Sequence, residues 1–193
     1  TRYNWALFNI FNEVENNSIE LNVNDIKFQL QADYEINENL KYTFLGSTRY
    51  ANSNSEHSVT ENSNVAGAYR ANETTIVRDQ NYFLFSDPDN PNAPPKVVLP
   101  VGGILTTDKN SLVTYTFRNA LDWTKRFKDD LHGIRIYGGQ EYRHADRSKS
   151  KNTGYGYQFS RGGTVFTDPD MLKKQILEGN DYFSASETRQ REI

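Results

Sequence analysis

The feature that most constrains the fold is a strict alternation of apolar and polar residues from Ile26 to Ile36. Side chains on a β-strand point to opposite faces in turn, so this stretch predicts a strand with one apolar and one fully polar face. Asn37-Glu38-Asn39 then supplies turn-forming residues, and the alternation resumes from Leu40 to Tyr50. Together these segments predict a β-hairpin.

A second hairpin is predicted further along the chain. Apolar residues alternate from Val113 to Trp123, with Asn119 as a polar interruption of the apolar face. The polar segment from Lys125 to Asp130 predicts a tight turn, and weaker alternation from Ile134 to Arg143 predicts the return strand. We therefore expect an all-β fold with about four antiparallel strands of roughly 10 residues each, in two hairpins. Residues 19–23 would add a fifth strand if they are paired.

Long connections alternate with these short turns. Roughly 60 residues separate the hairpins and about 50 follow the second one, which is far more than most connections need. The long connections are therefore expected at one end of the sheet, as in outer-membrane barrels with short periplasmic turns and long external loops. Within them, the Ser/Asn-rich segment 52–64 is expected to be exposed. A short helix is expected from Met171, because Asp168-Pro169-Asp170 is a start signal and Gly179 a stop signal.

Composition narrows the class of protein. No run of about 18 apolar residues is present, so the sequence predicts no transmembrane helix. Hydrophobic residues make up 36% of the chain and aromatic residues 13%, which suits barrel strands with wet loops and argues against disorder. The formal net charge is -3 and no Lys/Arg-rich run occurs, so we expect no nucleic-acid partner.

Several segments resemble one family of membrane proteins. Residues 116–123 are Thr-Phe-Arg-Asn-Ala-Leu-Asp-Trp, and Phe127, His132 and then 138–143, Gly-Gly-Gln-Glu-Tyr-Arg, follow. These segments are similar to barrel strands of SusC/RagA-type TonB-dependent transporters, in which a strand with the pattern T-x-R-N-x-L-x-Y returns through a short turn. Residues 154–158 and 13–17 are similar to a loop motif and to a segment before a strand in the same family.

The resemblance implies an antiparallel transmembrane β-barrel in the bacterial outer membrane that imports glycans or peptides. It also implies a plug domain, energy from TonB, and a SusD-like lipoprotein as a lid. The plug and the TonB box are not in this sequence, so energy coupling and gating are assigned to no residue. A sheet in lipid must close on itself, and bacterial barrels start at about eight strands. Residues 1–193 are therefore expected to be a fragment of the barrel domain.

No catalytic constellation is visible, and we expect neither an enzyme nor a cofactor. His57, His132 and His144 lie far apart in the sequence and lack the spacing of metal ligands. Asp87-Pro88-Asp89-Asn90 offers oxygen ligands but lacks the spacing and glycine of a calcium loop, so a proline-stiffened turn is the better prediction. The glycines at 154, 156, 162 and 163 are expected to permit tight loop packing.

Two sets of residues are candidates for function. Aromatic residues of the long connections could contact a ligand or a partner, or could pack their own loop: Tyr82, Phe83, Phe85, Tyr155, Tyr157 and Phe159. Residues on the polar face of the strands would line the barrel lumen: Lys27, Gln29, Gln31, Asp33, Arg118, Arg135 and Glu141. Four further aromatic residues are expected near strand ends, where an interfacial girdle would place them: Tyr42, Tyr50, Trp123 and Tyr142.

The main alternative is a secreted, soluble β-sandwich that binds carbohydrate, and a surface adhesin domain is a weaker one. In a sandwich the same apolar residues would form the core and the same polar residues the solvated face, so alternation alone does not separate the two folds. A sandwich would need seven or more short strands at spacings of about 8 to 12 residues, and the sequence does not show them.

Overall fold

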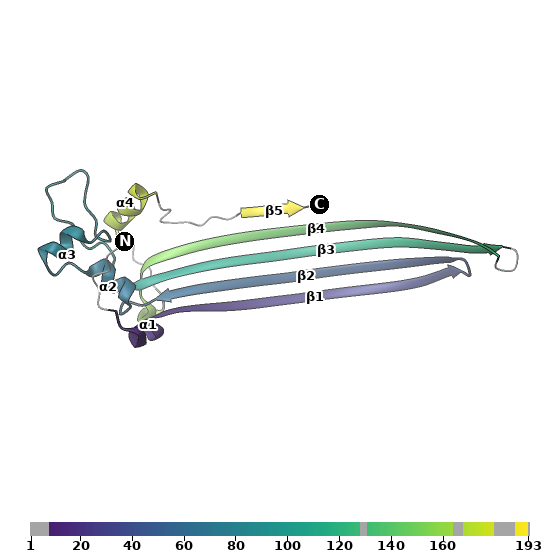
Figure 1. Ribbon diagram of the computed structural model, residues 1–193, viewed down its shortest axis with the longest axis horizontal. Coiled ribbons are helices and arrows are strands. Elements are labelled where there is room, and N and C mark those ends of the chain that lie inside the picture. The colour runs from purple at the N-terminus through teal and green to yellow at the C-terminus, as the bar shows by residue number, and fades with distance from the viewer. Residues whose placement is uncertain (1–7, 128–130, 164–167, 180–187, 193) are drawn as a thin grey trace. The chain divides into compact units, whose positions relative to one another are not determined.

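The computed structural model describes residues 8–127, 131–163, 168–179 and 188–192. It is mostly β-sheet with a few short helices (Figure 1). The strands are β1 (Asn17–Asn37), β2 (Leu40–Val59), β3 (Gly103–Phe127), β4 (His132–Tyr157) and the short β5 (Thr188–Glu192). The helices are α1 (Ile10–Asn16), α2 (Asn64–Arg70), α3 (Thr75–Gln80), the 3-10 turn η1 (Phe159–Arg161) and α4 (Pro169–Leu177).

The sheet confirms the predicted all-β class and the two hairpins. Its strand order follows the chain, β1-β2-β3-β4-β5, and β5 is antiparallel to β4 with Ala145 opposite Glu192 and Lys149 opposite Thr188. Within the described residues β1 and β5 are the two edges, so the sheet is open. The first hairpin turns through Glu38 and Asn39, as predicted.

The strands are about twice as long as predicted. They contain 21, 20, 25 and 26 residues from β1 to β4, whereas alternation predicted roughly 10 each. The prediction stopped where the apolar face stopped, but the strands continue through residues without a continuous apolar face; in β1 the apolar positions Ile19, Leu21 and Val23 lie on the opposite face. Segment 52–59, expected as an exposed loop, lies in β2, and Gly154 to Tyr157 lies in β4. Of the predicted second turn, Lys125 to Phe127 belongs to β3, and residues 128–130 lie outside the described residues.

The long connections contain all the described helices except α1, which precedes β1. Asp168 caps α4 by accepting hydrogen bonds from the backbone N–H groups of Asp170 and Met171, and Gly179 follows at φ 72°. These are the predicted start and stop signals, so the sequence located this helix correctly. Among the described helices, none is long and apolar enough to span a membrane.

The chain forms two compact units. The helical unit comprises Thr1–Leu21, Asn54–Asp108 and Ser150–Ser186, and the sheet unit comprises Asn22–Ser53, Lys109–Lys149 and Glu187–Ile193. The helical unit has an apolar core, in which Phe85 and Met171 are 3% and 0% exposed. The core residues come from the second and third segments of this unit: Val59, Ala66, Phe85, Val98, Leu99, Ile104 and Met171.

The sheet unit has no such core. Its buried apolar residues, among those the structure describes, are Ala120 and Ala145. Ala120 lies against Gly139, where a Cβ would approach the Asn119 carbonyl oxygen to 3.0 Å. The unit is therefore a single layer of strands, an arrangement that needs something else against its apolar face to be stable.

Candidate functional site

One face of the sheet unit is apolar and uncovered. Phe28, Leu30 and Ile136 are 65%, 55% and 60% exposed, although each is a residue type normally buried. Large apolar residues with exposed side chains occur in all four long strands of this unit, at Ile26, Phe28, Leu30, Tyr34, Ile36, Tyr50, Tyr115, Phe117, Leu121, Ile134, Ile136 and Tyr142. A continuous exposed surface of this kind marks contact with a protein partner or a membrane.

The apolar face ends partway along each strand. By alternation, the positions that continue the apolar face beyond Ile26, Tyr50, Val113 and Tyr142 are polar. They include Asn24 and Asn22 in β1, Asn52 in β2, Ser111 and Lys109 in β3, and His144, Asp146 and Ser148 in β4. The hydrogen bond between the Ser111 and Ser148 hydroxyls, 2.7 Å, shows that these two positions share a face. Each strand thus carries an apolar band followed by a polar continuation.

Asn119, a polar interruption of the band, has a hydrogen-bond partner inside it. The Tyr42 hydroxyl donates a hydrogen bond of 2.6 Å to Oδ1 of Asn119 on the neighbouring strand. A Cβ at Gly46 would meet the Phe44 ring at 3.2 Å and the Phe117 ring at 3.9 Å, so these aromatic side chains lie over a position without a side chain. Tyr50 and Tyr142 lie within their strands rather than at strand ends, at the end of the apolar band.

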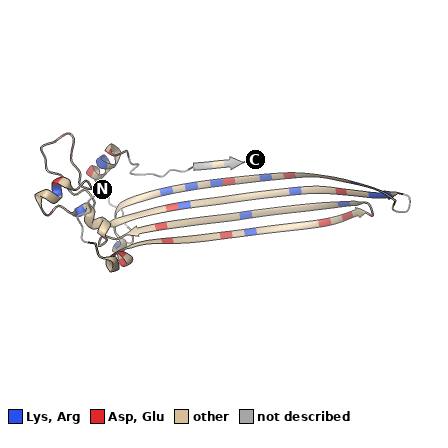
Figure 2. Cartoon of the chain, viewed as in Figure 1, with Lys and Arg blue, Asp and Glu red and all other residues tan. Residues whose placement is uncertain are grey.

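The opposite face carries charged side chains that pair across strands. Basic and acidic positions recur along all four long strands (Figure 2). Arg118 donates from Nε to Oε2 of Glu141 at 2.7 Å, and Arg135 donates from Nε to Oδ1 of Asp122 at 3.0 Å. Arg49 makes a bidentate contact with Asp25, with distances of 2.9 and 2.5 Å.

Some of the predicted lumen-facing residues take part in this network of cross-strand contacts. Asp33 accepts hydrogen bonds from Thr43 at 2.7 Å and Gln31 at 3.2 Å, and Lys41 lies 3.4 Å away. The side chains of Lys27 and Gln29 have no hydrogen-bond or ion-pair partner among the described residues. Asp25, Arg49, Asp122 and Arg143 belong to the same face but were missing from the predicted set. Arg49, Asp122 and Arg143 occupy polar positions inside the predicted strands, so keeping every polar position would have included them, and following the alternation one residue before Ile26 would have added Asp25.

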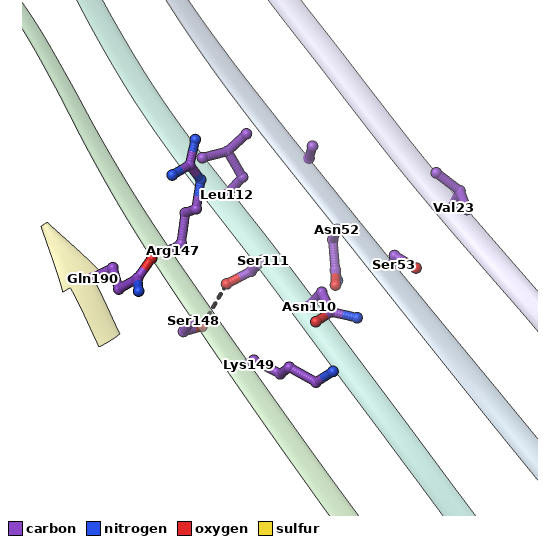
Figure 3. A pocket seen from close by; sticks show the side chains of 11 residues that line it. Val23, Asn52, Ser53, Asn110, Ser111, Leu112, Arg147, Ser148, Lys149 and Gln190 are labelled. Atoms are coloured by element: carbon purple, nitrogen blue, oxygen red, sulfur yellow. Dashed lines mark hydrogen bonds between the residues drawn. The ribbon is translucent and has the colours of Figure 1, made fainter. Parts of the chain in front are cut away.

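Two hollows lie on the sheet unit. One, of about 550 Å³, brings the predicted residues Lys27 and Glu141 together. It is lined by Asp25, Lys27, Ser47, Arg49, Leu112, Thr114, Thr116, Glu141 and Arg143. The other, of about 460 Å³, shares Leu112 with the first and carries amide, hydroxyl and basic side chains, including Asn52, Arg147 and Lys149 (Figure 3).

The predicted aromatic contact residues all lie in the helical unit but in different surroundings. Phe85 is part of the core at 3% exposure, so its side chain is closed to any ligand. Phe83 and Tyr155 flank the Tyr69 ring, with centroids 4.8 and 6.4 Å away, and burial raises the pKa of Tyr69 above its usual range. Phe83, Phe85 and Tyr155 therefore pack within the helical unit.

The other three aromatic residues remain accessible. Tyr157 and Phe159 meet edge to face, with centroids 4.8 Å apart, and line a hollow of about 340 Å³ together with Arg161. Tyr82 is 46% exposed and lines a separate hollow with Lys174. Gly163, at φ 83°, lies so close to the Tyr157 hydroxyl that a Cβ would overlap it, which accords with the predicted role of the glycines in tight packing.

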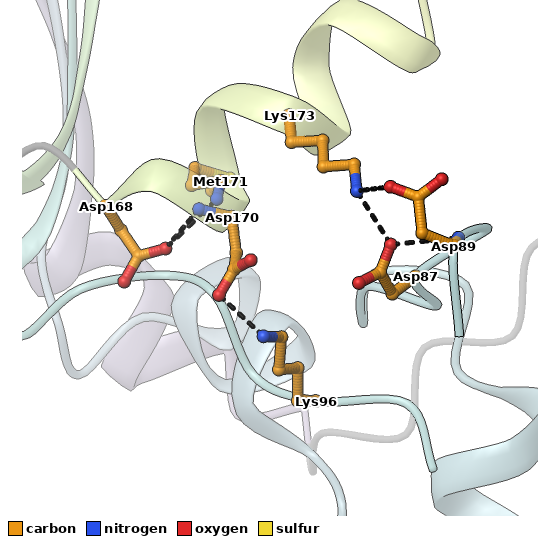
Figure 4. Close-up of polar contacts among 7 residues, drawn as sticks. All are labelled: Asp87, Asp89, Lys96, Asp168, Asp170, Met171 and Lys173. Carbon is orange, nitrogen blue, oxygen red and sulfur yellow. Dashed lines mark hydrogen bonds and ion pairs between the residues drawn. The ribbon is translucent and has the colours of Figure 1, made fainter. Parts of the chain in front are cut away.

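The loop from Asp87 is a turn whose carboxylates bind the ammonium group of Lys173 (Figure 4). The Asn90 N–H donates to the Asp87 carbonyl at 3.0 Å, as expected for a proline-stiffened turn. The Lys173 ammonium donates to the Asp87 and Asp89 carboxylates at 2.8 and 2.5 Å. Lys173 thereby holds the pKa of Asp87 below its usual value, and the two carboxylates raise the pKa of Lys173 above its own.

Residues 13–17, which resemble a segment before a strand in the SusC/RagA family, connect different parts of the helical unit. Glu13 accepts a hydrogen bond from the Asn64 backbone N–H at the start of α2, and Asn17 donates to Glu13 at 3.1 Å. Asn17 also contacts His57 Nε2 at 2.7 Å, and Asn16 accepts from the Thr60 hydroxyl at 2.5 Å. These side chains attach α1 to β2 and to the loop before α2.

The histidines lie apart in the fold as well. His57 is engaged by Asn17, His132 begins β4, and His144 lies within β4 rather than ending it. In the part of the chain that the structure describes, no group of three or more His, Asp or Glu side chains is placed to hold a metal ion. No known protein-family model matches this chain, and no curated protein is significantly similar to it.

Proposed function

We propose that this chain forms part of the barrel wall and external loops of a TonB-dependent nutrient importer of the SusC/RagA type in the bacterial outer membrane. The apolar band of the sheet unit faces lipid in this proposal, and the charged face lines the lumen. The helical unit supplies the ordered external loops. The chain carries out no bond chemistry.

The observation that carries this proposal is the limited height of the apolar band on strands that are longer than the band. At roughly 3.3 Å per residue and about 45° of tilt, the stretch from Ile26 to Ile36 rises about 25 Å. Lipid-facing bands of outer-membrane barrels are about 25 Å tall. The band then gives way to Asn24 and Asn22 on the same face, although β1 itself continues. An apolar face of finite height matches a hydrocarbon layer with water beyond it.

The sheet's open edges also support the proposal. Backbone groups at an edge cost several kcal/mol each in lipid, so the strands of a membrane sheet must pair around a closed ring. The remaining strands, the plug and the TonB-coupling region would then belong to a longer parent protein that contains this segment. The Tyr42–Asn119 hydrogen bond agrees with this setting, because a polar pair facing lipid has no water to bond.

The SusD-like lipoprotein and the glycan or peptide substrate come from the resemblance. An exposed apolar group on the helical unit offers a surface for such a lid or for neighbouring loops: Ile10, Phe11 and Val14 are 56%, 81% and 72% exposed. The alternative of a soluble β-sandwich has less support, because a sandwich buries its apolar face under a second sheet. The described residues form one sheet.

The test is an electrophoresis experiment on membranes of the source organism, with boiled and unboiled samples and an antibody to residues 40–59. We expect a band far above 22.2 kDa that migrates differently when the sample is not boiled, because a closed barrel resists unfolding by the denaturing detergent of the gel until it is heated. A band near 22.2 kDa in the soluble fraction that boiling leaves unchanged would overturn the proposal and favour a secreted module.

A further inference from the structure

The larger hollow of the sheet unit has a distinctive balance of charge. It is lined by three basic side chains, Lys27, Arg49 and Arg143, and two acidic ones, Asp25 and Glu141. Both carboxylates already have a cation. Arg49 holds Asp25 at 2.9 and 2.5 Å, and Arg118 holds Glu141 at 2.7 and 2.5 Å. Lys27 and Arg143 therefore remain as the uncompensated charges.

Neither of these two cations is engaged. Among the described residues, the side chains of Lys27 and Arg143 have no hydrogen-bond or ion-pair partner. An ammonium and a guanidinium carry donors only, so whatever they bind must supply acceptors. Charge-assisted hydrogen bonds to carboxylate, sulfate or phosphate oxygens are the strongest contacts available to such groups.

The hydroxyl groups of the hollow point to the same ligand chemistry. Ser47, Thr114 and Thr116 line it, and none of their hydroxyls has a hydrogen-bond partner in the described part of the chain. A hydroxyl can rotate to donate, so the hollow offers three neutral donors beside two free cations. Its unpaired side-chain groups thus match an acceptor-rich anion.

The neighbouring hollow extends the positive character. It shares Leu112 and adds Arg147 and Lys149 without any Asp or Glu (Figure 3). Together the two hollows carry five basic and two acidic side chains, whereas the whole chain has a formal net charge of -3. The positive charge is therefore concentrated where the strands form these hollows. Low-dielectric walls around such a site would focus its field on an approaching anion.

We propose that the hollow around Lys27 and Arg143 is a binding site for an anionic group, a carboxylate or sulfate, on the imported solute. The inference rests on the proposed function, which places the site in an import path. It adds that the imported solute carries a negative charge. Binding joins no atoms covalently. Lys27 on β1 and Arg143 on β4 supply positive charge from the two sides of the hollow, and the hydroxyls of Ser47, Thr114 and Thr116 between them donate to the anionic oxygens.

The experiment measures binding of inorganic sulfate to the complete, detergent-purified parent protein by equilibrium dialysis. Lys27→Gln with Arg143→Gln removes both free cations, and we expect sulfate binding to weaken at least tenfold. Lys109→Gln is the matched control, because Lys109 is an exposed cation of β3 that alternation places on the other face. The affinity of the Lys109→Gln variant for sulfate should stay within twofold of that of the wild type.

Equal binding by the double variant and the wild type would overturn the inference, as would an equal loss in Lys109→Gln. A sulfated disaccharide, its unsulfated counterpart and an acidic dipeptide then distinguish the sources. Binding of the sulfated sugar alone assigns the site to acidic glycans, and binding of the dipeptide alone assigns it to peptides. Equal binding of the charged and uncharged disaccharides would contradict anion recognition.

The same preparations separate this inference from the proposed function. Each variant is run boiled and unboiled. If all of them shift on boiling but bind sulfate equally, the barrel stands and the anion site fails. If sulfate binding depends on Lys27 and Arg143 in a protein that does not shift, the anion site stands and the transporter proposal fails.

Discussion

The helical unit and the sheet unit differ in what they do with apolar side chains. The helical unit buries a set of them in a core, where Met171 and Ala66 are both 0% exposed. The sheet unit exposes them, and residues as large as Phe28 and Ile136 are 65% and 60% exposed. Both units belong to one chain of ordinary amino acids, so composition does not explain the contrast. The helical unit is organised to exclude water by itself, whereas the sheet unit needs an outside apolar medium.

The polar groups show the same contrast. In the helical unit they fasten segments together, as when Arg70 donates to the carbonyl oxygens of Pro100 and Gly102 at 3.0 and 2.6 Å. In the sheet unit the arginine–carboxylate pairs join neighbouring strands across the charged face. Exposed pairs of this kind contribute little stability individually. Their main effect is to keep the polar face hydrated while the other face remains apolar.

The largest expected effect comes from opening the core of the helical unit. Phe85→Ala should destabilise that unit by about 3–5 kcal/mol, because a buried aromatic ring leaves a cavity. Phe28→Ala is the matched change in the sheet unit, and it should cost far less because the side chain has no core to leave. Limited proteolysis of the long connections in the detergent-solubilised parent protein measures both. Equal sensitivity of the two variants would show that the units do not differ as described.

The second prediction tests the apolar band directly. Phe28→Arg should destabilise the assembled parent by about 2–4 kcal/mol, since the proposed function makes this the middle of a band that faces lipid. Gln29→Arg changes the opposite face, and Asn24→Arg changes the same face beyond the band. Both should be mild. The measurement is the fraction of each variant that reaches the outer membrane and migrates differently when unboiled.

The two controls separate two errors. If Gln29→Arg were as harmful as Phe28→Arg, the assignment of faces would be wrong. If Asn24→Arg were as harmful, the faces would be right but the band would be taller than the alternation indicates.

Local patterns carried most of what the sequence predicted correctly. The hairpins follow from alternation and turn residues, and α4 follows from Asp168 and Gly179, because each of these signals lies within a few residues of its effect. The ends of the strands were missed for the same reason. Asn52 belongs to a polar segment without alternation, and residues 19–23 alternate in the opposite phase from Ile26–Ile36, so they were predicted only as a separate strand; that both segments extend β1 and β2 depends on neighbouring strands, which a local pattern does not report.

Contacts between distant segments could not be predicted. The core brings Phe85 against residues such as Met171, and the Lys173–Asp87 contact joins positions 86 residues apart. No spacing in the sequence pairs them. Residues of the charged face were partly predicted because alternation assigns a face, but which cation pairs with which carboxylate depends on strand register.

A smaller effect is expected at the polar interruption of the apolar band. Tyr42→Phe removes the donor to Asn119 and leaves an amide oxygen without its partner, which should cost about 1 kcal/mol. Asn119→Leu combined with Tyr42→Phe should recover most of the loss, because both polar partners are then gone. Thermal unfolding of the heat-modifiable form gives the four free energies of the double-mutant cycle.

The Tyr50→Phe variant is the control for this cycle. The Tyr50 hydroxyl has no hydrogen-bond partner among the described residues, so its removal should be nearly neutral. Additive effects of Tyr42→Phe and Asn119→Leu would mean that the hydrogen bond does not contribute in the assembled sheet.

The smallest effect concerns the contact between α4 and the Asp87 loop. The pKa of Asp87 is lowered in the folded chain, mainly by its hydrogen bond with Lys173. A carboxyl group whose pKa is lowered on folding stabilises the fold at pH values above its ordinary pKa of about 3.9. This contribution is lost as the pH falls through the pKa of the group in the folded chain. Lys173 has a raised pKa, so its contribution is present below about 10.4 and is lost only in stronger alkali. Protection of α4 from hydrogen exchange should therefore be flat from pH 5 to 8 and fall below about pH 4.

Lys173→Met tests whether that acid sensitivity belongs to this contact. The substitution keeps an apolar stem of similar length but removes the ammonium that bridges Asp87 and Asp89, so the decline below about pH 4 should flatten. Lys96→Met removes the other cation between the same two segments, at 2.6 Å from Asp170. It should leave the dependence on Asp87 largely in place. An unchanged acid profile in Lys173→Met would assign the transition to other carboxylates and would leave the helical unit held by its apolar core alone.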